Sequence, residues 1–228
     1  FYDNVGALRD VGQNHILQML ALVAMDEPKS FEADAIRTER AKVLEKLIPI
    51  KDKSLLTQVV RAQYEGYQKE KGVKPESDTE TYFRLETYID SPRWNKTPFY
   101  LESGKALSEA KAEIDVYFKN PQSDNRQNII TFRIQPDEGI KIRFWMKTPG
   151  FGLKVEPKTL KFRYSDLPSL ATMPDAYERV LYDAIVGDQT LFASTDEVLY
   201  AWDYITPIVD RWRSVPLKHY KKGAEFVD

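Results

Sequence analysis

Hydrophobic residues recur along residues 5–25 with the period of an α-helix. At about 100° per residue, the apolar side chains share one broad arc, which comprises Leu8, Val11, Met19, Leu22 and Val23. The polar side chains Asp10, Gln13, Asn14 and Gln18 fall on the other side. His15 lies in the middle of the apolar arc. The pattern therefore predicts a helix that directs a histidine toward the core.

Further along the chain, three segments have the start and stop signals of helices, namely residues 30–47, 175–186 and 196–212. Residues 55–65 are interpreted as extended chain. The stretch 66–80 is polar, charged and rich in turn-forming residues, so we expect an exposed loop there.

The middle of the chain has the period of two that is typical of strands. Apolar and polar residues alternate over residues 81–89, 114–118, 130–134, 140–146 and 160–164. Short, turn-rich connections between these segments favour antiparallel pairing. The order helices, sheet, helices lacks βαβ alternation, so it predicts an α+β fold in one domain. We expect a large, mainly antiparallel β-sheet with helices packed on one face.

The second face of this sheet is mixed in character. It carries aromatic residues together with Arg133, Lys141, Arg143, Trp145, Lys161 and Arg163. Such a face is either solvated or meets a second sheet in a dimer.

Composition narrows the function classes. The chain has 228 residues, 42% of them hydrophobic and 30% charged, which is typical of a globular protein. A net charge of −2 gives no bulk attraction to nucleic acid or to an anionic membrane. The chain has no cysteine and two histidines, so we expect no disulfide, no thiolate nucleophile and no metal site. The longest apolar run, residues 16–25, is too short for a membrane span.

Candidate chemistry is sparse when the residues are considered alone. The sequence contains no GxGxxG turn, P-loop or GxSxG elbow, and it begins without an initiator Met, so we expect it to start within a longer protein. His15 is either a hydrogen-bonded core histidine or a general base that lines a cleft, because imidazole titrates near neutral pH. Asp10 alone indicates a solvated first-turn acid, and Lys105 alone a surface charge.

Five ordered segments resemble the glucose-6-phosphate dehydrogenase family. The first, FYDNVGALRDVGQNHILQMLALVAMDEP, is similar to the helix that carries the family's catalytic histidine. The others follow in the family's order: YIDSPRWNKTPFYLESGKAL, FRIQPDEGI, MPDAYERVLYDAIVGDQTLF and DEVLYAWDYITPI. The resemblance extends from residue 1 to about residue 216.

The resemblance implies that residues 1–228 form the C-terminal substrate-binding and dimerisation domain of a cytoplasmic oxidoreductase. In the family, an N-terminal Rossmann domain binds NADP, and that domain is missing from this chain. The implied activity is oxidation of glucose 6-phosphate to 6-phosphoglucono-lactone, with hydride transfer to NADP, in the oxidative pentose phosphate pathway of glucose metabolism. The implied assembly is a homodimer through the β-sheet, with no nucleic-acid or membrane partner. The isolated chain is predicted to be inactive, because it has no segment for the cofactor.

The same resemblance implies roles for four residues. His15 is the general base that removes the proton from the C1 hydroxyl, and the substrate-binding residues are Asp10, Lys105 and Gln135. One difficulty arises, because Asp10 and His15 lie about 140° apart on an ideal α-helix and share no face. Gly12 between them would permit a distortion.

Two departures from the family pattern change the expectation. Five residues after Lys105, many relatives have a second basic residue that faces the phosphate, and this chain has Ala110. This departure supports an alternative, a catalytically silent paralogue or assembly module that retains the fold. Glu102 and Asp115 stand where animal relatives with a structural NADP have arginines, so we expect no structural NADP.

Overall fold

The computed structural model describes residues 2–120, 126–167 and 176–227. Contacts divide the chain into two compact units. The first unit comprises Phe1–Ser108 and Tyr177–Asp228, and the second comprises Glu109–Ala176. The single domain expected over residues 1–228 stays a prediction.

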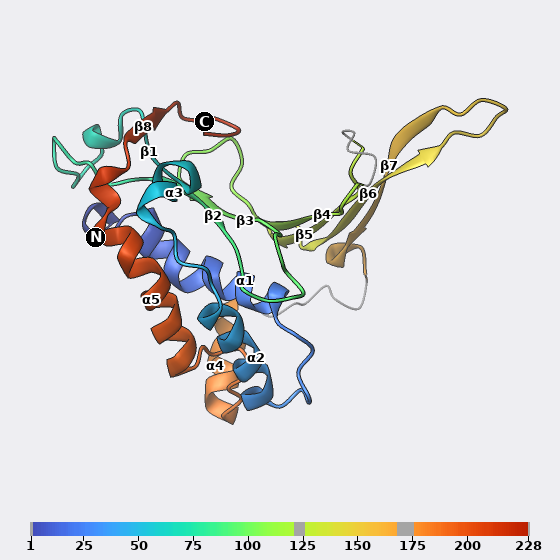
Figure 1. Cartoon of the computed structure of the whole chain (residues 1–228), viewed down its shortest axis with the longest axis horizontal. Helices are drawn as coiled ribbons and strands as arrows, with labels where there is room; N and C mark the ends of the chain where they lie inside the picture. Colours follow the sequence, from blue (N-terminus) through green and yellow to red (C-terminus); the bar gives the residue numbers. More distant parts are fainter. Residues whose placement is uncertain (1, 121–125, 168–175, 228) are drawn as a thin grey trace. The chain divides into compact units, whose positions relative to one another are not determined.

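The helix predicted over residues 5–25 has two parts, a π-helix (Leu8–Ile16) and α1 (Leu17–Ala24). The other helices are α2 (Ala33–Glu45), α3 (Asp52–Gln58), α4 (Ala176–Val186) and α5 (Thr195–Asp210). α2 packs against both α1 and α5 (Figure 1). Helix α3 corrects one expectation, because residues 55–58 are helical and only the following residues are extended.

The sheet of the first unit has the strand order β3-β2-β1-β8. Its strands are β1 (Val59–Tyr64), β2 (Tyr82–Thr87), β3 (Phe99–Gly104) and β8 (Leu217–Tyr220). β8 runs parallel to β1, and the other pairs are antiparallel. One face, with Phe83 and Leu85, joins the core formed with the helices; the other face, with Tyr82, packs against Tyr67 and Tyr220. Both faces of this sheet are therefore covered.

The second unit is an antiparallel sheet of order β4-β5-β6-β7. Its strands are β4 (Ala112–Tyr117), β5 (Ile129–Gln135), β6 (Gly139–Lys147) and β7 (Val155–Arg163), of which β6 and β7 form a long hairpin (Figure 1). Ile142 pairs with Ile130 on one side and with Leu160 on the other, so apolar side chains share one face. Several of them are exposed, including Leu160 at 61% and Phe162 at 40%.

The α+β class is confirmed, and helices pack on one face of the first sheet. The strands form two four-stranded sheets instead of one hydrogen-bonded sheet. β3 is an edge strand of the first sheet, and the chain leaves it before β4 begins at Ala112. In between, Leu107 forms a bridge with Ala224. The alternation in the sequence locates strands, but it does not specify which strands share a sheet.

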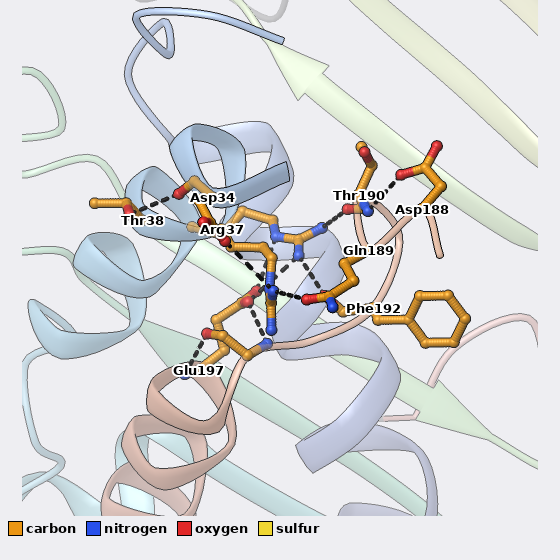
Figure 2. A network of polar contacts seen from close by, with 10 residues as sticks. Asp34, Arg37, Thr38, Asp188, Gln189, Thr190, Phe192 and Glu197 are labelled. Atoms are coloured by element: carbon orange, nitrogen blue, oxygen red, sulfur yellow. Dashed lines mark hydrogen bonds and ion pairs between the residues drawn. The ribbon is translucent and has the colours of Figure 1, made fainter. Parts of the chain in front are cut away.

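A buried ion pair joins α2 to the beginning of α5. Arg40 Nε lies 2.8 Å from Glu197 Oε1, and the Arg40 guanidinium also donates to the carbonyls of Thr190 and Phe192. Figure 2 shows Thr190, Phe192 and Glu197 arranged around this network of polar contacts. Glu197 in turn accepts a hydrogen bond from the Ser194 backbone N–H at 2.7 Å, which completes a capping box at the start of α5.

Candidate active site

The segment that carries Asp10 and His15 is a π-helix. The Leu17 N–H donates to the carbonyl of Gly12, five residues earlier, which is the π-helical hydrogen bond. Residues five apart therefore lie approximately one turn apart, and Asp10 and His15 come to the same side of the helix. Such segments are rare and occur frequently at functional sites. The distortion removes the difficulty that an ideal α-helix poses.

Close packing against β2 depends on Gly12. A Cβ atom at this position would lie 2.8 Å from Phe83 Cζ and 3.0 Å from Leu8 Cδ1, closer than side chains normally approach. Glycine thus allows the phenyl ring of β2 to reach the helix backbone. The distortion and the packing occur at the same residue.

Glu80 fixes the beginning of the π-helix. Its Oε1 accepts a hydrogen bond from the Leu8 N–H at 3.1 Å, and its Oε2 accepts one from Trp212 Nε1 at 2.8 Å. Burial raises the pKa of this carboxyl. The predicted exposed loop over residues 66–80 is confirmed for most of its length, but Tyr67, Ser77 and Glu80 within it are buried. A polar stretch gives no signal that its side chains cap another element.

His15 itself is exposed, so the prediction of a core-facing histidine is wrong. The core-histidine interpretation fails with it. Leu22 and Val23, which the ideal helix places in the core, are exposed as well. The buried positions are Leu8, Gly12, Gln13, Ile16, Leu17, Leu20, Ala21 and Ala24. The slower winding of the π-helix rotates the buried arc away from His15.

Lys105 directly follows β3, and its backbone is held from two sides. Its N–H donates to the Thr81 carbonyl at 2.9 Å, and its own carbonyl accepts a hydrogen bond from the Tyr220 hydroxyl at 2.6 Å. The ammonium nitrogen lies 4.3 Å from the ring centroid of Tyr2, a cation–π contact. Burial raises the pKa of Tyr2, and the charge of Asp10 contributes to the rise. Tyr2 is therefore within electrostatic range of Asp10 and in contact with Lys105.

Gln135 lies at the end of β5 in the second unit, where it is exposed and opposite Ala112. Ala110 is exposed too. The neighbouring Lys111 forms ion pairs with Glu113 and, at 3.7 Å, with Glu109. Its charge is therefore already balanced within this unit.

Three residues that hold the π-helix or Lys105 in place could not be identified from the sequence pattern. Tyr2 lies in a 3-10 helix of only three residues, Glu80 lies outside any helix or strand, and Tyr220 ends a strand too short to show a period. In the described parts of the chain, no group of three or more histidine or acidic side chains is placed to hold a metal ion. No helix among the described residues is long and apolar enough to cross a membrane.

Together, the fold and the site define an α+β protein with a π-helix that carries a histidine and a carboxylate, and with a lysine whose backbone is anchored at the end of β3. The model of the family "Glucose-6-phosphate dehydrogenase, C-terminal domain" matches residues 1–226, and the chain belongs to this family. The resemblance seen in the sequence is thereby confirmed.

Curated relatives support this assignment. The chain is 39% identical to a glucose-6-phosphate 1-dehydrogenase of Chlamydia muridarum, over 94% of this chain and 46% of the relative. It is 44% identical to that of Aggregatibacter actinomycetemcomitans, over 92% of this chain and 45% of the relative. The chain thus spans about half the length of the curated relatives it matches.

Solved structures agree. A glucose-6-phosphate dehydrogenase in complex with its substrate glucose-6-phosphate superimposes with a TM-score of 0.90 at 32% identity, over 100% of this chain and 49% of that chain. The enzyme from Mycobacterium avium superimposes with a TM-score of 0.82 at 34% identity, over 98% of this chain and 48% of that chain.

Proposed function

We propose that the complete protein containing this domain is a cytoplasmic, NADP-dependent glucose-6-phosphate 1-dehydrogenase of the oxidative pentose phosphate pathway. Family membership over residues 1–226 and the relative solved with glucose 6-phosphate support this proposal. The observation that carries it is the π-helix, which brings Asp10 and His15 to one side. Its direct test is NADP reduction by the complete protein with glucose 6-phosphate, compared with free glucose.

In this proposal, the His15 imidazole accepts the proton of the C1 hydroxyl. The O–H bonding pair then forms the C=O bond of the lactone as the C1–H bond breaks and its hydrogen leaves as hydride. NADP, when bound, would accept that hydride. No glycine-rich turn in these 228 residues fits its pyrophosphate, so the chain's own contribution is the base and the sugar contacts.

The remaining roles concern binding. The Asp10 carboxylate accepts a hydrogen bond from a sugar hydroxyl, one turn away from the base. The Lys105 ammonium, exposed and in contact with the ring of Tyr2, donates to a substrate oxygen. Gln135 is proposed as a further amide contact to the sugar.

Ala110 leads to a prediction about affinity. In the complete protein, Ala110→Arg should tighten glucose 6-phosphate binding by roughly 3- to 30-fold, because charge-assisted hydrogen bonds to phosphate are strong. Calorimetric titration measures the change, with Ala110→Gln as the uncharged control. Free glucose should bind equally to all three proteins. An equal gain for glucose, or no gain, would show that this side chain does not face the phosphate; a protein that binds neither sugar would favour the assembly module.

The proposed homodimer forms through the second unit. The sequence draws attention to the mixed face of this sheet, but its apolar face carries several exposed aliphatic and phenyl side chains: Ile142 at 36%, Phe132 at 38%, Phe162 at 40% and Leu160 at 61%. Exposed apolar patches of this kind mark interaction sites. A two-fold contact would pair this face with its own copy.

An Ile142→Glu/Leu160→Glu double variant is therefore expected to shift the complete protein from dimer to monomer in light scattering at micromolar concentration. Arg143→Glu is the matched control, because it places the same charge on the opposite face of β6 next to Ile142. Dissociation by Arg143→Glu alone would place the contact on the mixed face. A monomeric unmodified protein would contradict the dimer altogether.

A further inference from the structure

The first unit contains a cavity of about 420 Å³ at the beginning of the π-helix. Its walls come from the start of that helix, from β1, from residues 78–80 before β2, and from the region at the end of α5. None of the four predicted site residues lines it. The cavity is therefore separate from the proposed sugar site.

Arg61 is the unusual group in its wall. It lies on β1 opposite Phe83, so its side chain is on the helix-covered face of the sheet. The side chain is only 7% exposed, and its buried Nε has no hydrogen-bond partner among the described residues. The Asp78 carboxylate is 3.8 Å away, too far for a hydrogen bond, and is itself 61% exposed. A buried guanidinium without close acceptors is costly.

A second guanidinium adds to this imbalance. Arg213, in the turn Trp212–Ser214, also lines the cavity. Burial is the largest effect on the pKa of Arg61 and lowers it, the charges of Asp78 and Glu80 oppose this, and the charge of Arg213 lowers it by the smallest contribution. The two guanidinium groups thus line one cavity and repel each other weakly.

The other charged side chains of the cavity wall already form hydrogen bonds within the protein or are exposed to solvent. Glu80 accepts hydrogen bonds from Leu8 and Trp212, and Arg9 donates to the carbonyls of Val5 and Asn4. Asp210 is exposed. Glu80 is as buried as Arg61, but both of its carboxylate oxygens already accept hydrogen bonds from other groups. The cavity therefore offers the buried Arg61 Nε as a donor without a hydrogen-bond partner.

We propose that Arg61 and Arg213 bind a phosphate group in this cavity, as inorganic phosphate or as part of a small phosphorylated metabolite. The planar fork of a guanidinium matches the oxygens of phosphate and donates two parallel hydrogen bonds. A cavity of about 420 Å³ is within the range of small-molecule sites. The proposal does not rest on the proposed dehydrogenase activity.

The test is calorimetric titration of the complete protein with inorganic phosphate at constant ionic strength. It is done in a Lys105→Ala background, so that the predicted sugar site does not contribute. Phosphate should still bind to this background. Adding Arg213→Gln, which changes an exposed side chain, should weaken phosphate binding by about tenfold or more, because the substitution removes a charge-assisted contact. Arg61→Lys should weaken it as well. Arg93→Gln, which changes an arginine that is paired with Asp26 away from the cavity, should leave it unchanged.

Asp78→Asn distinguishes the proposal from a purely structural role of Arg61. Removing the competing carboxylate should tighten phosphate binding, whereas a structural ion pair would show only lower thermal stability. Absence of phosphate binding in the Lys105→Ala protein would overturn the proposal, as would equal affinity with Arg213→Gln or no tightening with Asp78→Asn. Competition by glycerol 3-phosphate would assign the site to phosphorylated metabolites, and absence of competition to free phosphate.

Discussion

Replacing His15 with glutamine in the complete protein is expected to lower kcat by about 10²–10⁴-fold, the usual contribution of a positioned general base. Glutamine keeps a polar side chain of similar size but cannot accept the C1 proton at neutral pH. The exposed position of His15 means that the change removes no core packing. Initial rates of NADP reduction against glucose 6-phosphate concentration measure kcat, and calorimetry should report a much smaller change in substrate Kd.

The other histidine provides the matched control. His219 lies on β8 and is exposed, so His219→Gln should leave kcat unchanged. If His15→Gln kept near-normal kcat, His15 would not be the base, whatever its effect on the melting temperature. Loss of activity in both variants would point to a general requirement for histidine charge instead.

Glu197→Ala is expected to lower the free energy of unfolding by about 3–5 kcal/mol, since it leaves a buried charge without its partner. The Arg40 and Glu197 side chains are 8% and 0% exposed. The substitution also removes the acceptor of the Ser194 N–H and so opens the cap of α5. Urea unfolding followed by circular dichroism measures the loss.

An exposed ion pair on α2, the helix that carries Arg40, provides the comparison. Asp34 is 97% exposed and lies 3.6 Å from Arg37 (Figure 2). Asp34→Ala should therefore cost less than about 1 kcal/mol, as is typical of surface ion pairs. A similarly small loss for Glu197→Ala would mean that the carbonyls of Thr190 and Phe192 are sufficient partners for Arg40.

Much of the fold follows from the sequence by itself. Strands β5 and β6 coincide with segments whose side chains alternate with a period of two, because each strand exposes successive residues to opposite faces. β7 overlaps its predicted segment, residues 160–164, but begins earlier, at Val155. Helix α5 begins after Ser194, as its capping pattern allows, and continues to Asp210, close to the predicted end. The family and its histidine helix are also evident from ordered motifs.

Only the tertiary structure decided how that histidine is presented. An ideal helical wheel buries His15 and separates it from Asp10, but packing of Phe83 against Gly12 and capping by Glu80 accompany a π-helix in which both share one side. The sheets were decided in the same way, because β8 pairs with β1 across more than 150 residues of sequence. Periodicity reports the environment of each residue along its own segment. Contacts between distant segments set the winding of the π-helix and the membership of each sheet.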